Sequence, residues 1–95
     1  MEGKYLPIGS VVKLKDVDLE LMIIGYLKKP EEKIYDYSAC IYPLGIVTSV
    51  LDTVVFNHEQ IEKIYHVGYK SEKFEGINRV LIKIMNAVEA EKNDK

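Results

Sequence analysis

Apolar and polar residues alternate along most of the first 70 positions, and a two-residue period is typical of half-buried β-strands. In the first such segment, Val12 and Leu14 alternate with lysines. The pattern predicts strands at residues 10–15, 19–28, 35–42, 53–56 and 64–69. Gly25 lies inside the second segment and predicts a bend or bulge there.

The predicted strands are separated by residues that favour turns and loops. Residues 16–18 are polar and suit a hairpin turn, whereas residues 28–33 combine a proline with charged side chains and predict a surface loop. Pro43 ends the third strand. Asn57 and Gln60 have the spacing of a capping box, which predicts a short helical turn before the fifth strand.

The period changes at Ser71, which is the expected N-cap of a C-terminal amphipathic helix over about residues 71–91. Its apolar stripe consists of Phe74, Ile77, Leu81, Ile84, Met85 and Val88. Val80 and Ile82 lie beside that stripe and make the apolar surface wider than packing on one side requires, which hints at a second contact.

Strands followed by one helix predict an α+β fold. We expect a single domain over residues 1–95, in which a small curved antiparallel sheet or barrel of four to five strands, over about residues 6–69, precedes the helix. The pattern leaves open whether the helix covers the sheet or stands away from it.

Composition narrows the class of protein. The chain has 95 residues and a formal net charge of −2 spread over interspersed lysines and glutamates, which argues against a nucleic-acid binder. Cys40 is its single cysteine, so no internal disulfide is expected. The first residues do not read as a signal peptide, and the longest apolar run, residues 21–24, is too short to insert into a membrane. We therefore expect a cytoplasmic protein.

The sequence offers little for catalysis or metal binding. Cys40, His58 and His66 are metal-ligand types, but no pair has the close spacing of a structural zinc site. No serine or cysteine has a recognisable activating partner, and no phosphate-binding loop is present. We expect no metal, no cofactor and no enzymatic activity, with His58 exposed in the capped turn.

The tyrosines are the better candidates for function, because tyrosine combines a large contact area with a polar tip. The alternative is that they are half-buried strand residues selected for β propensity. We predict a partner-binding surface for which the first candidates are Tyr35, Tyr37 and Tyr42, and the second candidates are the helix residues Ile77, Leu81 and Ile84.

An ordered set of short strings resembles a known family. The strings are Leu6-Pro7-Ile8-Gly9-Ser10-Val11-Val12, Leu21-Met22-Ile23-Ile24-Gly25-Tyr26, Tyr35-Asp36-Tyr37, Tyr42-Pro43 with Gly45, Phe56-Asn57-His58-Glu59-Gln60-Ile61, and Gly68-Tyr69. Together they look like the domain of unknown function 4176 family of Gram-positive bacteria, over residues 6–69.

The resemblance implies a function. Genes of this family tend to lie beside those for type VII secretion substrates, especially toxins with an LXG domain, and some members are thought to act as toxin-associated chaperones or targeting partners. The expected partner is therefore a secreted toxin. An immunity protein that neutralises such a toxin is the alternative, and a small enzyme is the third class.

Overall fold

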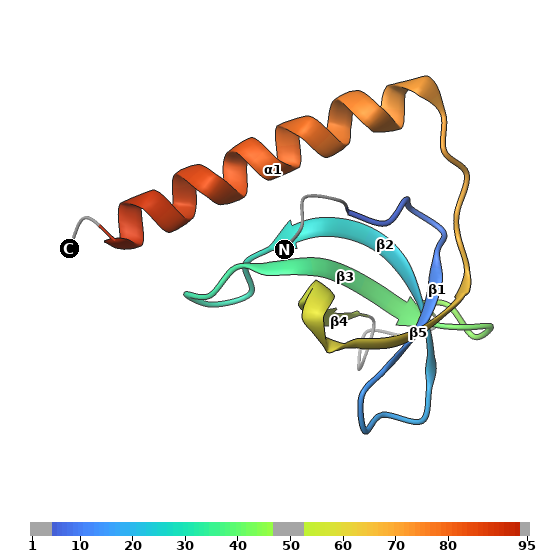
Figure 1. Ribbon diagram of the computed structural model, residues 1–95. Helices are drawn as coiled ribbons and strands as arrows, with labels where there is room; N and C mark the ends of the chain where they lie inside the picture. Colours follow the sequence, from blue (N-terminus) through green and yellow to red (C-terminus); the bar gives the residue numbers. More distant parts are fainter. Residues whose placement is uncertain (1–4, 47–52, 94–95) are drawn as a thin grey trace.

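The computed structural model describes residues 5–46 and 53–93, with an antiparallel sheet followed by one long helix (Figure 1). Its elements are β1 (Val11–Leu14), β2 (Glu20–Lys28), β3 (Tyr35–Ile41), β4 (Val54–Phe56), the 3₁₀ helix η1 (His58–Gln60), β5 (Ile61–His66) and α1 (Glu72–Asn93). The strand order is β4-β3-β2-β1-β5. The fold is α+β as predicted, and the sheet is open, with β4 and β5 at its edges.

Register shifts between paired strands accompany the curvature of the sheet. The pairing of β2 with β3 shifts between Ile23 and Gly25, which confirms the bulge predicted at that glycine. A Cβ atom at Gly25 would lie 2.6 Å from the Ser38 Oγ atom, so the two strands approach too closely there for a larger residue. The pairing of β1 with β5 also shifts, after Val11 and after Lys13.

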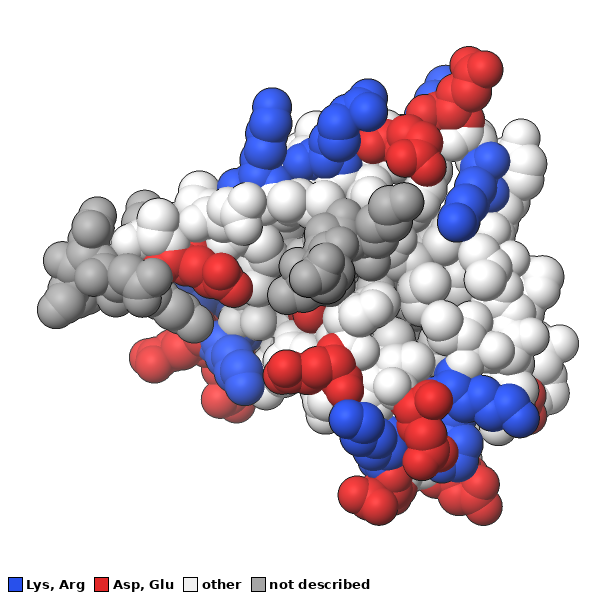
Figure 2. Space-filling view, viewed as in Figure 1, with Lys and Arg blue, Asp and Glu red and all other residues white. Residues whose placement is uncertain are grey.

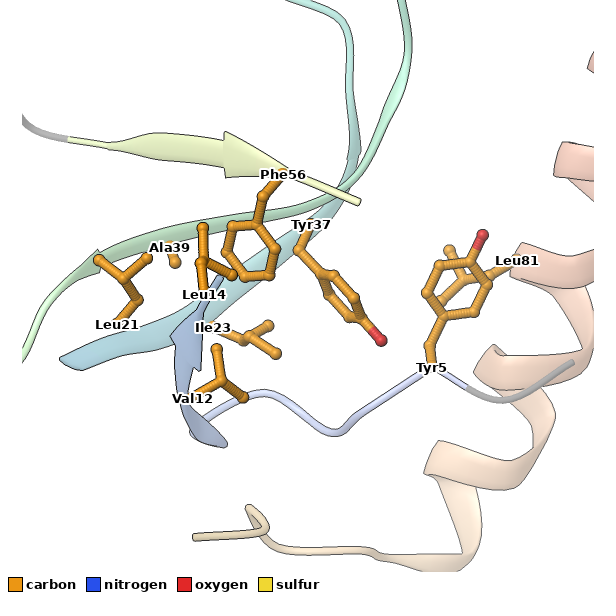
Figure 3. Packing of buried hydrophobic residues seen from close by; sticks show 9 residues of the cluster. All are labelled: Tyr5, Val12, Leu14, Leu21, Ile23, Tyr37, Ala39, Phe56 and Leu81. Carbon is orange, nitrogen blue, oxygen red and sulfur yellow. The ribbon is translucent and has the colours of Figure 1, made fainter. Parts of the chain in front are cut away.

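The hydrophobic core is centred on one face of this curved sheet (Figure 3). Tyr37 and Phe56 are fully buried, and their ring centroids are 5.3 Å apart. Around them pack the buried side chains of Val12, Leu14, Leu21, Ile23 and Ala39. Because four of the five strands supply these residues, the core joins the sheet across its width.

The segment before β1 lies between the sheet and α1 (Figure 1), and Tyr5 connects the two. Its main-chain N–H donates to Asn78 Oδ1 at 2.8 Å, and its ring makes edge contacts with Tyr26 and Tyr37 at 5.7 Å between centroids. Leu81 of α1 belongs to the same buried cluster and lies beside Tyr5 (Figure 3). The helix therefore reaches the core largely through this segment.

Helix caps form where the sequence predicts them. The Phe74 N–H donates to Ser71 Oγ at 3.3 Å, so Ser71 caps α1. The Asn57 N–H donates to Gln60 Oε1 at 2.8 Å, as expected of a capping box.

The fifth strand begins and ends three residues earlier than predicted, because the chain leaves β1 before Gly68. The Gly68 N–H donates to Ser10 Oγ at 2.9 Å. A Cβ atom at Gly68 would clash with the Ile8 carbonyl oxygen, so this close crossing of two main-chain segments requires glycine.

Candidate functional site

The helix α1 has one short packed side. Asn78 and Leu81 are buried on it, and Ile82 and Met85 are partly buried against the core cluster. Successive residues of a helix are rotated by about 100°, so these four positions share one face. The sequence left open whether the helix covers the sheet or stands away from it. In the structure, one face of α1 packs against the core cluster and its other faces are exposed.

A second apolar strip runs beside the packed side of α1, and we call Ile77, Val80 and Ile84 the outer row. Their exposed fractions are 49%, 50% and 45%. The spacing of three and four residues aligns them along the helix. Three large apolar side chains that remain half exposed in a line form a surface on which another helix packs well.

Two of the predicted partner-binding residues belong to the core instead. Tyr37 has no exposed surface, and Leu81 is only 8% exposed. Tyr37 is buried because it packs on Phe56 and its hydroxyl joins two other segments, accepting from the Leu6 N–H at 3.0 Å and contacting His58 Nδ1 at 2.7 Å. Neither side chain is accessible to a partner while the domain is folded as described.

The other two predicted tyrosines are accessible but lie apart. Tyr35 begins β3 and is half-buried, with the Lys33 ammonium group over its ring. Tyr42 follows the far end of the same strand and is exposed. A seven-residue strand is about 23 Å long, so the structure does not bring the two together. Of the six predicted residues, Ile77 and Ile84 are the pair that lies on one exposed surface.

The strand β5 presents a further apolar surface that the sequence pattern missed. Alternation predicted one buried face, yet Ile64 and Tyr65 are both exposed although they point to opposite faces. In the described residues β5 pairs only with β1, so it is an edge strand, and of its apolar residues Ile61 alone packs against the core cluster. Figure 2 shows uncharged surface continuing over the segment between β5 and α1, where Val67 and Tyr69 are also exposed.

A polar cluster connects β3, η1 and the first described residues. The Tyr5 hydroxyl donates to Asp36 Oδ1 at 3.3 Å, and the His58 main-chain N–H donates to Asp36 Oδ2 at 2.9 Å. Burial, helped by the Asp36 charge, raises the pKa of Tyr5, and burial raises the pKa of Tyr37. Burial lowers the pKa of His58 below its ordinary value of 6.5.

His58 is therefore half-buried and bonded, and the expectation that it would be exposed in the turn is wrong. The Tyr37 hydroxyl, which reaches it from the core, gives it a partner that no sequence spacing reveals. The arrangement is not that of a hydrolase pair, because Asp36 contacts the main chain of His58 and not its imidazole ring. Cys40 is buried in β3, and the described residues contain no group of three His, Cys, Asp or Glu side chains placed to hold a metal.

A cavity of about 350 Å³ opens between this cluster and the C-terminal half of α1. Asp36, His58 and Tyr5 line it on the sheet side, and Ile82 and Met85 line it on the helix side. The outer row and this cavity lie on opposite sides of the packed face of α1. Helix positions two residues apart, such as Val80 and Ile82, are rotated by about 200° from each other. The outer row and this cavity are thus separate candidate surfaces, in addition to the exposed apolar residues of β5.

Comparison with known protein families identifies the family of this domain. The model of the domain of unknown function family DUF4176 matches residues 5–76, about three quarters of the chain. Neither the curated proteins nor the solved structures contain a significant match. The matched region ends early in α1, so the outer row lies beyond it. Across the described residues, no helix combines the length and apolar character needed to span a membrane.

Proposed function

The chain belongs to the DUF4176 family, and we propose that it is a non-enzymatic protein-binding module that docks its partner on the outer row of α1. The observation that carries this proposal is the half-exposed line of Ile77, Val80 and Ile84 on a helix whose neighbouring face already reaches the core. Apolar side chains at this spacing anchor helix-on-helix and helix-in-groove contacts.

The partner that we propose is a secreted toxin of the LXG type, bound in the cytoplasm before its export by type VII secretion. This identification rests on the family resemblance, which implies an accessory chaperone or targeting partner. The outer row supports the proposal because a chaperone needs accessible apolar surface that its own core does not use.

Co-expression with an LXG toxin encoded beside its gene tests both the proposed docking surface and the proposed partner. The double variant Ile77→Ala/Ile84→Ala is expected to bind the toxin at least about thirtyfold more weakly, since truncating interface anchors costs about 2 kcal/mol or more. The matched control is Glu75→Ala/Arg79→Ala, which changes two exposed positions on another face of α1 and leaves the net charge unchanged. It should bind normally.

The readouts separate the competing roles. A chaperone raises the solubility or export of the toxin, and the double variant should lose that effect while its thermal stability stays close to that of the parent. Abolished toxicity with unchanged export would assign an immunity role instead. Unchanged affinity of the double variant would exclude the outer row as the docking surface.

A further inference from the structure

The cavity under the C-terminal half of α1 has a negatively charged lining. Among the described residues that line it, Asp36, Glu59 and Glu89 contribute carboxylates and Lys33 contributes the one ammonium group, an excess of two negative charges. The Lys33 Nζ atom lies over the Tyr35 ring, 5.3 Å from its centroid. Figure 2 shows acidic side chains both below the C-terminal part of the helix and on the sheet side facing it. The lining therefore favours a cation.

Among the lining residues, Asp36 is the best candidate for the group that contacts this cation. It is 8% exposed, and buried carboxylates are normally paired with a positive charge. Its two donors within the part of the chain that the structure describes, the Tyr5 hydroxyl and the His58 main-chain N–H, are neutral. Among the described residues, the one salt bridge joins Lys13 to Glu62, so none compensates Asp36. A carboxylate has about four acceptor positions, which leaves about two of them free.

The rest of the lining fits the carbon chain that carries such a charge. Ile82 and Met85 form the apolar helix side of the cavity, and Tyr5 adds its ring. The long methylene chains of arginine and lysine lie along surfaces of this kind while the charged end reaches a polar site. A free amino acid fits less well, because its own carboxylate would meet Glu59 and Glu89, which are both exposed at the cavity.

We propose that this cavity receives an arginine or lysine side chain of a protein partner, with the cationic end directed at Asp36. The proposal rests on the proposed protein-binding function for the source of the side chain, but it concerns a different surface from the outer row. A partner would thus be held on two sides of α1, by apolar packing on one and by charge on the other. Arginine is the better probe, because its planar guanidinium group donates two parallel hydrogen bonds to a carboxylate.

Titration of the isotopically labelled protein with N-acetyl-arginine N-methylamide, followed by NMR, tests the cavity without any partner. We expect saturable shifts at Asn57 and Asn86, which line the cavity. The matching citrulline derivative has the same shape without the charge and should bind at least about tenfold more weakly, because loss of a charged hydrogen-bonded pair costs about 1.4 kcal/mol or more.

Variants locate the site. Glu59→Gln/Glu89→Gln removes two exposed cavity carboxylates and should weaken arginine binding about threefold to tenfold. The control Glu20→Gln/Glu75→Gln makes the same change in net charge at exposed positions outside the cavity and should bind like the parent. Asp36→Asn should abolish binding; because it also loses a buried charge, its folding is checked by its NMR spectrum.

Equal affinity for the arginine and citrulline derivatives, or no saturable shift at the cavity, would overturn the proposal. Binding that appears only in a Lys4→Gln variant would assign the cavity to this chain's own first residues and would overturn it as well. Failure here leaves the outer row untouched, since Ile77→Ala/Ile84→Ala is expected to bind the arginine derivative normally. Failure of the outer-row experiment likewise leaves the arginine titration as an independent result.

Discussion

The sheet buries apolar side chains from four of its five strands, whereas within its described part α1 buries just one large apolar side chain, Leu81. In the sheet, Tyr37 and Phe56 have no exposed surface. On the helix, Ile77, Val80 and Ile84 remain about half exposed. The four strands β1 to β4 therefore use most of their apolar residues for stability, whereas the helix and the edge strand β5 have apolar surface left for another molecule. The partner-binding surface is best sought where apolar residues contribute least to the fold.

The largest expected contrast is between a core tyrosine and an outer-row isoleucine. Tyr37→Ala should lower the free energy of unfolding by about 3 to 5 kcal/mol, because it empties a fully buried site. Ile84→Ala should change it by less than about 1 kcal/mol, since the side chain is half exposed and alanine favours helix. Urea denaturation measures both. A loss above about 2 kcal/mol for Ile84→Ala, typical of a core truncation, would mean that the outer row belongs to the core.

The same substitution at two glycines sharpens the comparison. Gly68→Ala should destabilise the protein by about 1 to 3 kcal/mol, because its Cβ atom would clash with the main-chain oxygen of Ile8. Gly76→Ala in α1 meets no atom within 4 Å and should stabilise by about 0.5 to 1 kcal/mol through helix propensity. Thermal melts of the two variants should shift in opposite directions. Shifts of the same sign would contradict this difference in packing.

The smallest expected effect is on the pH dependence of stability. The pKa of His58 is lowered in the folded state by burial, so the unfolded chain binds a proton more readily. The contribution of the His58 imidazole to the free energy of unfolding is fully present above about pH 6.5. It is lost as the pH falls from there through the folded-state pKa. Denaturation curves between about pH 7.5 and about pH 5, on either side of the ordinary histidine pKa, should show this decrease. His58→Gln should flatten the curve in that window, and an equally steep curve would exclude His58 as its origin.

Much of the fold could be predicted from local sequence signals. The sequence pattern located β1 to β4 and placed β5 three residues too late, Gly25 located the bulge, and Ser71 located the start of the helix. These features depend on neighbouring residues along the chain, so a single sequence contains them.

The exposure of individual side chains was harder to predict. Tyr35 and Tyr37 share an alternating segment, but only Tyr37 packs on Phe56, because β4 pairs beside it. His58 is half-buried because a hydroxyl from β3 reaches it. The cavity combines residues from η1, β3, α1 and the first segment. Each of these depends on pairing between distant segments, which periodicity does not encode.

The hydrogen bond from Tyr5 to Asn78 joins positions separated by 73 residues. The entropic cost of closing a loop rises with its length, and contacts of this range tend to form late in folding. The strands β1, β2 and β3 pair over shorter distances along the chain, so this part of the sheet can assemble before α1 docks. By the same logic, α1 is the unit that detaches with the least free energy while the sheet persists. In amide hydrogen exchange, α1 should then open as a separate cooperative unit. Once it has detached, its packed side is exposed as well.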